Sequence, residues 1–289
     1  MPISHVSDTA RWVAWYRAME TERQDAIFRD PFARRLAGPE GEALVHEIPA
    51  GLRMAPALIV RTAVFDELIL DRVANHDIDL VLDLGAGLDA RPWRLALPPS
   101  LQWIDADHPA ILDYKTSLLR DEQPHCRYDA VPVDLTDTAA RNALIARLGA
   151  AYRNALIVSE GLLIYLEPAA VADLARALHV PESFRWWLAD LANPRLLKII
   201  ARSQGSSLLR APFRFAPGES GAFFRPFGWH EVLFRSAMED ARRLDRQMRL
   251  TWLWRILVQL RTPAVREEFR RMSGVVLLQR DQAVADATP

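Results

Sequence analysis

The stretch DLVLDLGAGLDAR at residues 79–91 decides the fold of this chain. Its first half is a short apolar run, which is typical of a parallel strand that is buried on both faces of a sheet. The run ends at Gly85 and Gly87, and glycine at such a turn lets the backbone approach a ligand closely. Doubly wound sheets bind ligands in the crevice at the carboxyl ends of their strands. The stretch therefore predicts a strand over residues 79–85 followed by a ligand-binding turn.

Strands and helices alternate along the chain after this stretch. Apolar runs predict further strands over residues 101–107, 128–134, 155–159, 184–191 and 274–279. Helical segments separate the first of these strands, including one over residues 168–178. This alternation is the pattern of βαβ units with right-handed crossovers. The sequence therefore predicts an α/β fold with a doubly wound, mostly parallel sheet.

Helices are expected before the first strand and in the last third of the chain. Apolar residues at three- and four-residue steps predict leading helices over residues 7–28, 31–37 and 57–74. After Ala192 the chain becomes rich in proline, glycine and phenylalanine. Within this region, Gly228-Trp229-His230 opens a predicted helix, and the segment around Trp252 is expected to form a further helix or cap.

Composition excludes several classes of protein. The 289 residues carry a formal net charge of −1, which gives no overall field for binding nucleic acid or an anionic membrane. The single Cys126 excludes an internal disulfide and a metal site built on paired cysteines, and the histidines are scattered, so no metal is expected. No apolar run reaches about 18 residues, and residues 1–23 are polar. These features predict a cytoplasmic protein with neither a nucleic-acid nor a membrane partner.

Carboxylates follow the glycine turn at a spacing that suits a nucleoside. Asp105 and Asp107 close the second predicted strand, where a carboxylate can accept hydrogen bonds from both hydroxyls of a ribose. The pattern Gly85-x-Gly87-x-x-Ala90 also satisfies the dinucleotide fingerprint. A nicotinamide dinucleotide and S-adenosylmethionine both contain such a ribose, and a tight turn without a ligand is the third interpretation.

Three features favour S-adenosylmethionine over the dinucleotide. Asp83 precedes the first glycine by two residues, and its negative charge would repel a pyrophosphate but attract an ammonium and a sulfonium. The long helical leader is unlike the simplest dehydrogenase layout, which starts with the strand. Glu160 places a second carboxylate after the fourth predicted strand, at the same edge of the sheet.

In order and spacing, the chain resembles the leucine carboxyl methyltransferase family, which includes bacterial O-methyltransferases similar to polyketide-tailoring carboxyl methyltransferases. The motifs are DLGAGLDAR at 83–91, WRL at 93–95, DHP at 107–109 with Lys115, VDL at 133–135 and SEGLLIYL at 159–166. The similarity extends upstream to Arg61-Thr62 and Asp66 and covers most of residues 8–180. The last third matches only loosely, through Phe227-Gly228-Trp229.

The resemblance implies a class I methyltransferase fold, with a Rossmann-like, seven-stranded, mostly parallel sheet, a helical N-terminal lid and a C-terminal insertion. It implies one catalytic domain over residues 1–289. Its parts would be a helical cap over 1–78, a cofactor-binding core over 79–192, and a substrate-side insertion with the last strands over 193–289. The implied reaction is methylation of a carboxylate or hydroxyl oxygen on a small molecule. An NAD(P)-dependent oxidoreductase and a non-catalytic scaffold are the alternatives.

The resemblance also implies roles for single residues towards S-adenosylmethionine. Gly85 and Gly87 would line the methionyl portion, and Asp107 would hold the ribose; Asp83 is a cofactor residue on the charge argument given above. Asp134 and Leu135 would frame the adenine, Arg61 would meet the carboxylate, Glu160 would lie near the ammonium, and Tyr165 would close the pocket. An arginine suits a carboxylate and acidic groups suit an ammonium. The alternatives are a solvated helix charge for Arg61, a helix N-cap for Asp134 and a supporting role for Asp105.

The acceptor side of the reaction is less defined by the sequence. A carboxylate acceptor is already ionised at neutral pH and needs no general base, whereas an alcohol or phenol can use one. His230 is the candidate for this base. The alternative is that His230 is an ordinary residue at the start of a helix. Aromatic residues between Phe184 and Trp254, with Trp12 and Trp15, are expected to line a pocket for a hydrophobic or aromatic acceptor. Packing in the core is the alternative for each of them.

Overall fold

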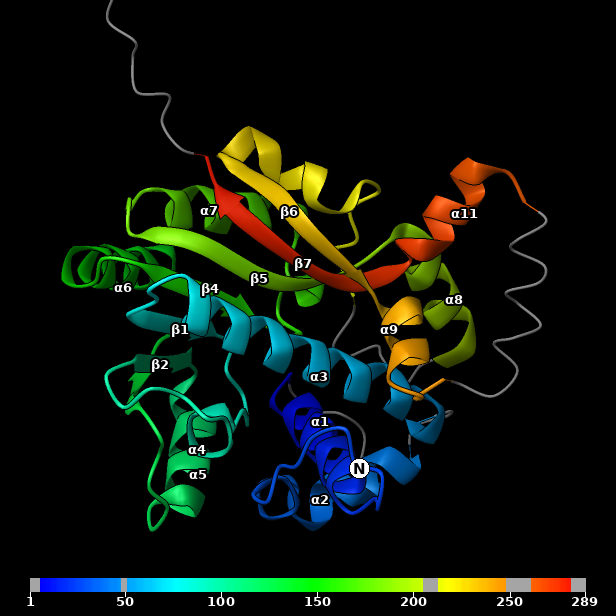
Figure 1. Ribbon diagram of the computed structural model, residues 1–289, viewed down its shortest axis with the longest axis horizontal. Helices are drawn as coiled ribbons and strands as arrows, with labels where there is room; N and C mark the ends of the chain where they lie inside the picture. The colour runs from blue at the N-terminus through cyan, green and yellow to red at the C-terminus, as the bar shows by residue number, and fades with distance from the viewer. Residues whose placement is uncertain (1–5, 48–50, 205–212, 248–260, 282–289) are drawn as a thin grey trace, which may run out of the picture.

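A seven-stranded sheet forms the centre of the computed structural model, which describes residues 6–47, 51–204, 213–247 and 261–281 (Figure 1). The strands are β1 (Leu80–Leu84), β2 (Gln102–Asp107), β3 (Arg127–Pro132), β4 (Ala155–Ser159), β5 (Phe184–Ala192), β6 (Trp229–Ser236) and β7 (Ser273–Arg280). Their order across the sheet is β3-β2-β1-β4-β5-β7-β6. Strands β1 to β5 are parallel, and β7 pairs antiparallel with both β5 and β6. The predicted doubly wound, mostly parallel sheet is confirmed.

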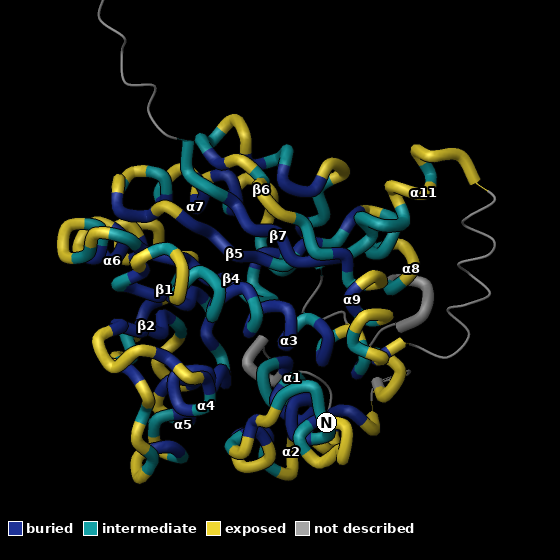
Figure 2. The backbone as a smooth tube through the Cα atoms, in the orientation of Figure 1, coloured by how far each residue is buried: buried dark blue, intermediate teal, exposed yellow. Residues whose placement is uncertain are grey.

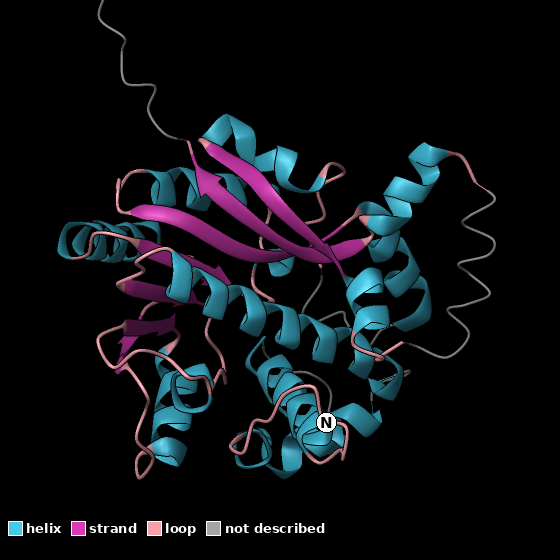
Figure 3. Cartoon of the chain, in the orientation of Figure 1, coloured by secondary structure: helices cyan, strands magenta, loops and turns pink. Residues whose placement is uncertain are grey.

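Helices cover both faces of this sheet (Figure 3). The first face carries α3 (Gly51–Asn75), α4 (Arg91–Arg94), α5 (Pro109–Leu119) and α9 (Ala237–Arg243), and the second carries α6 (Thr138–Ala151), α7 (Pro168–His179) and the 3-10 helix η3 (Ser220–Phe227). Because apolar side chains lie on both faces of the inner strands, these strands are buried between the two layers, as Figure 2 shows. The carboxyl ends of β1 to β5 meet at one edge, which we call the carboxyl edge.

The N-terminal cap consists of α1 (Val6–Thr21), α2 (Ala33–Glu47) and α3, and it covers the turn after β1. A Cβ atom placed on Gly87 would lie 3.2 Å from the Cβ of Ala10, so α1 touches this turn. Helix α1 ends at Thr21, before the predicted Phe28. Helix α2 bends at Gly38, where φ is 62°, and then continues beyond the predicted end.

An ion pair joins this cap to the last third of the chain. Arg246, which follows α9, holds Glu20 of α1 with Nη2 at 2.8 Å from Oε1 and Nε at 3.0 Å from Oε2. The Glu20 side chain is completely buried. Two regions that are distant in sequence therefore lie against each other beside the sheet.

The predicted helix at Gly228-Trp229-His230 is wrong. Trp229 begins strand β6, while Gly228 ends η3 in the left-handed conformation with φ 82°. The Trp229 indole is completely buried, donates from Nε1 to the carbonyl of Ala175 at 3.0 Å, and stacks edge-on against Trp187. This burial and the pairing with β7 hold the segment extended. The predicted helix or cap around Trp252 lies outside the described residues.

Most of the tryptophans that were expected to line an acceptor pocket pack in the core instead. Trp187 and Trp229 are among the largest fully buried side chains, Trp186 is buried beside α3, and Trp12 and Trp15 are buried in the cap. At these positions the alternative of core packing is the one that the structure supports.

Candidate active site

The turn between β1 and α4 lies at the carboxyl edge. Gly85 and Gly87 both adopt positive φ, 70° and 50°, which side chains disfavour. A Cβ on Gly85 would lie 3.0 Å from the side chain of Leu162, which follows β4. The amide of Gly85 donates to the carbonyl of Ala106 at 2.8 Å, which fixes the turn against the end of β2. In the predicted glycine turn, a side chain at Gly85 or Gly87 would therefore be disfavoured.

Asp107 lies directly against this turn. Its Oδ2 accepts a hydrogen bond from the Gly87 amide at 2.7 Å, and its Oδ1 accepts one from the His108 amide at 2.7 Å. Asp107 is the last residue of β2, so its carboxylate reaches the edge of the sheet rather than the core. Two of the predicted site residues, Gly87 and Asp107, are thus in direct contact.

Arg61 of α3 joins the ends of β4 and β5. Its Nε lies 3.0 Å from Oε1 of Glu160, and its Nη1 lies 3.1 Å from Oδ2 of Asp190. Burial opposes the guanidinium charge, but the attraction of Asp190 and Glu160 outweighs it and raises the pKa of Arg61. Arg61 is therefore held in an ion-pair cluster at the carboxyl edge and is not a solvated helix charge. Asp190 was not predicted as a site residue.

Arg91, at the start of α4, is the centre of a buried ion-pair cluster behind Glu160. It contacts Oε2 of Glu160 at 2.7 Å, Oδ2 of Asp89 at 2.6 Å and Oδ1 of Asp66 at 2.7 Å. Burial acts to raise the pKa of Glu160, but the charges of Arg91 and Arg61 dominate and lower it. Glu160 therefore stays ionised when the cluster is intact.

The cluster continues into the N-terminal cap. Arg94 contacts Oδ2 of Asp66 at 2.6 Å and Oδ2 of Asp30 at 3.7 Å. Arg17 of α1 contacts the same oxygen of Asp30 at 2.8 Å and donates to the carbonyl of Leu88 at 2.6 Å. A continuous series of ion pairs thus links the cap helix α1 to the glycine turn and to Glu160.

Asp83 is buried rather than exposed to a ligand. It is 2% exposed and lies beside Asp105 in the pairing of β1 with β2. Lys115 of α5 pairs with Asp105 at 2.5 Å and donates to the carbonyl of Asp89 at 3.1 Å. Burial, with Asp89 and Asp105 nearby, raises the pKa of Asp83 well above its usual range. The negative charge that we attributed to Asp83 is supplied at this edge by Glu160 and Asp190 instead.

Replacing Asp83 with asparagine is expected to raise the free energy of unfolding by about 1–3 kcal/mol at pH 8 and to change it little at pH 4. Because the folded-state pKa of Asp83 is raised, the wild-type protein loses stability as the pH rises above the unfolded-state value of about 3.9. The variant lacks this titration. Urea unfolding at both pH values measures the difference, and an equal difference at both would contradict the prediction.

Tyr165 lies where the cap meets the C-terminal insertion. It belongs to the 3-10 helix η1 (Leu163–Tyr165) and forms a side-chain hydrogen bond with Thr9 of α1. Its ring packs against Phe213 with centroids 5.6 Å apart. The carbonyl of Ile164 accepts from the amide of Arg214 at 2.7 Å, so the insertion is fixed to η1. This placement suits the predicted role of Tyr165 in closing a pocket.

Asp134 and Leu135 follow β3 at the far side of the same edge. Asp134 is exposed, and its Oδ1 accepts from the amide and the hydroxyl of Thr136 at 2.8 and 2.7 Å. The N-cap of α6 is Asp137, not Asp134. Leu135 packs its side chain against the core of the second face. Asp134 is thus held in position by its own turn, with its outer side open to solvent.

His230 lies away from these residues. Strand β6 runs parallel to β5, because both pair antiparallel with β7, and His230 is near its start. It is therefore at the edge opposite to Gly85. Its imidazole is exposed and contacts the carboxylate of Asp281. The structure therefore does not support His230 as the general base.

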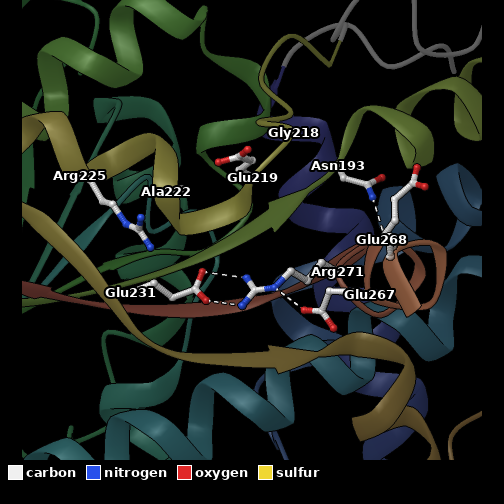
Figure 4. A pocket seen from close by; sticks show the side chains of 10 residues that line it. Asn193, Gly218, Glu219, Ala222, Arg225, Glu231, Glu267, Glu268 and Arg271 are labelled. Atoms are coloured by element: carbon white, nitrogen blue, oxygen red, sulfur yellow. Dashed lines mark hydrogen bonds and ion pairs between the residues drawn. The ribbon is translucent and has the colours of Figure 1, made fainter. Parts of the chain in front are cut away.

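A hollow of about 370 Å³ lies between η3, β6 and the helix α11 (Pro263–Arg270) (Figure 4). Arg271 is at its centre and contacts Oε1 of Glu231 at 2.6 Å and Oε1 of Glu267 at 2.9 Å. Asn193, after β5, donates to the carbonyl of Glu268 at 3.1 Å. Because these charged groups pair with one another, we interpret this hollow as a joint between elements.

Within the described ranges, no group of three or more His, Cys, Asp or Glu residues is arranged to hold a metal ion. Over the same ranges, no helix is long and apolar enough to cross a membrane.

Comparison with known proteins identifies the family. The model of the family described as leucine carboxyl methyltransferase matches residues 10–179. A protein from Streptomyces coelicolor assigned as an S-adenosyl-L-methionine-dependent methyltransferase is 39% identical over 178 residues, which cover 58% of this chain and 62% of the relative. A Mycobacterium marinum protein with the same assignment is 36% identical over 67% of this chain and 66% of its own length. The matches thus span slightly less than two thirds of each relative.

Solved structures agree on the fold. A DUF574 family protein from Streptomyces avermitilis superposes with a TM-score of 0.57 at 14% identity, covering 92% of this chain and 96% of that protein. A protein from Thermobifida fusca described as a methyltransferase superposes with a TM-score of 0.53 at 16% identity, and the match covers 93% of this chain and 94% of that protein. The family resemblance carried by the sequence motifs is confirmed, and the chain belongs to the leucine carboxyl methyltransferase family.

Proposed function

We propose that this chain is an S-adenosylmethionine-dependent methyltransferase that methylates an oxygen of a small-molecule acceptor. The observation that carries the proposal is the group formed by the glycine turn, Asp107, and Arg61 between two carboxylates at one edge of the sheet. This group offers a close backbone approach, a ribose acceptor, a guanidinium for a carboxylate and carboxylates for an ammonium. Membership in the leucine carboxyl methyltransferase family supports the same reaction.

The residues at the carboxyl edge fit the cofactor part by part. Gly85 and Gly87 would line the methionyl portion, because both have positive φ and their backbone, which carries no side chain, lets a ligand approach closely. Asp107 has both oxygens at the end of β2, where a ribose would lie, and Arg61 with Glu160 would bind the amino-acid end. Asp134 and Leu135 would frame the adenine beyond β3.

Bound S-adenosylmethionine would supply a methyl group on a sulfonium, which an acceptor oxygen can attack in line. The chain's own contribution is to position the reactants and to exclude water. Such positioning can lower a barrier by up to roughly 7–11 kcal/mol when the geometry is ideal. Helix α1 and Tyr165 cover the edge from one side, and the segment at Phe213 adjoins them from the other. A carboxylate acceptor would need no general base, which suits the family's carboxyl chemistry.

Calorimetric titration tests the proposal. We expect the purified chain to bind S-adenosylmethionine and S-adenosylhomocysteine and to show no heat of binding with NAD⁺ or NADH. Binding of NAD(H) alone would overturn the proposal in favour of an oxidoreductase. Binding of none of the ligands would favour a non-catalytic scaffold. Transfer of a labelled methyl group to a panel of carboxylic acids, phenols and alcohols would then identify the class of acceptor.

A further inference from the structure

Asp190, at the carboxyl end of β5, is an unassigned part of the carboxyl edge. Its Oδ1 accepts a hydrogen bond from the amide of Gly161 at 2.6 Å, and its Oδ2 contacts Nη1 of Arg61 at 3.1 Å. The Gly161 backbone has φ 67°, and a Cβ there would lie 3.2 Å from the Arg61 guanidinium. Asp190 therefore fixes the turn after β4 and one side of Arg61 together.

The ion-pair cluster that ends at Asp190 contains an excess of acid. Its guanidinium groups belong to Arg17, Arg61, Arg91 and Arg94, and its carboxylates to Asp30, Asp66, Asp89, Glu160 and Asp190. Four cations against five carboxylates leave one negative charge in this part of the described structure. Asp190 is the most exposed of the five, with 20% of its side chain accessible, so the excess charge faces the edge where a ligand would bind.

The two forms of the cofactor differ by one charge. S-adenosylmethionine carries a carboxylate, an ammonium and a sulfonium. During transfer the acceptor oxygen forms a bond to the methyl carbon, the carbon–sulfur bond breaks, and its electron pair stays on sulfur as a neutral thioether. The product cofactor therefore has no net charge on its amino-acid and sulfur groups, whereas the substrate cofactor has one positive charge. A site with one excess negative charge in a partly buried setting favours the cation.

We propose that Asp190 is a specificity-determining residue that makes this site prefer the sulfonium cofactor over its thioether product. The inference rests on the proposed function and deepens it. Without the charge of Asp190 the cluster would have four cations and four carboxylates, and Arg61 would keep Glu160, which it shares with Arg91, as its partner. The preference would assist exchange of spent cofactor for fresh cofactor after each turnover.

The Asp190→Asn variant removes the negative charge and keeps the contact with the turn after β4. An asparagine retains Oδ1 as an acceptor for the Gly161 amide, but its Nδ2 replaces Oδ2, so the hydrogen bond from Nη1 of Arg61 is lost together with the charge. Asp173→Asn is the matched control, because Asp173 pairs with Arg176 at 2.6 Å on the surface of α7 with 60% of its side chain exposed. Both variants and the wild type are titrated with S-adenosylmethionine, with S-adenosylhomocysteine, and with the analogue in which a protonated amine replaces the sulfonium.

In Asp190→Asn, we expect the ratio of the product Kd to the substrate Kd to fall by about tenfold, the effect of a unit charge across a partly buried site. The loss should come from weaker binding of the sulfonium and the amine analogue, with the thioether affinity within about twofold of wild type. Asp173→Asn should keep the wild-type ratio. Equal weakening of all three ligands would overturn the inference and leave Asp190 as an anchor for Arg61. An unchanged ratio would overturn it as well.

A second variant covers the case in which Asp190→Asn is poorly folded. Asp190→Glu retains the charge, and it should keep the wild-type ratio even if both affinities fall. If the ratio of the product Kd to the substrate Kd falls in Asp190→Glu as it does in Asp190→Asn, the inference is overturned. If the wild-type chain binds neither cofactor form, the proposed function fails and this inference fails with it. If the wild-type chain binds both cofactor forms and substitutions at residue 190 leave the ratio of the two Kd values unchanged, only this inference is rejected.

Discussion

Replacing Asp107 with alanine is expected to weaken binding of S-adenosylmethionine by at least about a hundredfold. Hydrogen bonds to a charged group contribute about 1.5–3 kcal/mol each, and a ribose would form two with this carboxylate. The Gly87 and His108 amides already orient the carboxylate, so the ligand would meet a preformed acceptor. Calorimetry on the variant measures the loss directly.

Asp113→Ala is the control for this prediction. Asp113 is exposed on α5, close to Asp107 in the sequence, and we expect its loss to change affinity by less than about twofold. The thermal midpoint should change by no more than about 3 °C in Asp107→Ala, because Asp107 is only partly buried at the end of a strand. An unchanged affinity in a folded Asp107→Ala protein would mean that the cofactor does not bind at this turn.

Replacing Arg91 with methionine is expected to lower the free energy of unfolding by about 3–5 kcal/mol, because it leaves buried carboxylates without their cation. Arg91 is 2% exposed and contacts Asp66, Asp89 and Glu160 within 2.7 Å. Its charge lowers the pKa of Glu160 and Asp89, so both would bind protons more readily in the variant. Urea unfolding at pH 7 measures the change.

The matched control for this variant is Arg34→Met. Arg34 pairs with Glu22 on the surface, where about half of each side chain is exposed, and such pairs contribute no more than about 1 kcal/mol. A loss below about 1 kcal/mol in Arg91→Met would show that Asp66, Asp89 and Glu160 find other partners, and the cluster would then not hold the site together.

The sheet could be predicted from sequence wherever local pattern determines structure. The predicted strand over residues 155–159 matches β4, and the other parallel strands agree within two residues at each end. Strand β6 was missed because its pairing partner β7 lies more than 30 residues later, and exposed Val232 and Leu233 obscure the alternation of a half-buried strand.

The site was predictable where a turn and a strand end coincide, as at Gly85, Gly87 and Asp107. Asp190 was missed because it lies inside a predicted strand and gains its role only through Arg61, which is 129 residues away. The signal that could have found it was its place at the carboxyl end of the fifth strand, next to Glu160 after the fourth. Asp83 was misjudged because the sequence does not show that α3, α4 and α5 cover its side of the sheet.

The order β5-β7-β6 has a consequence for how the chain folds during synthesis. Strand β6 is made before β7, yet β7 is its sheet partner and separates it from β5. Until Ser273–Arg280 leaves the ribosome, β6 has no neighbour to accept its backbone hydrogen bonds, and β5 is an open edge that can pair with another chain. The nascent protein therefore passes through an aggregation-prone stage that ends only when β7 is inserted between its two partners.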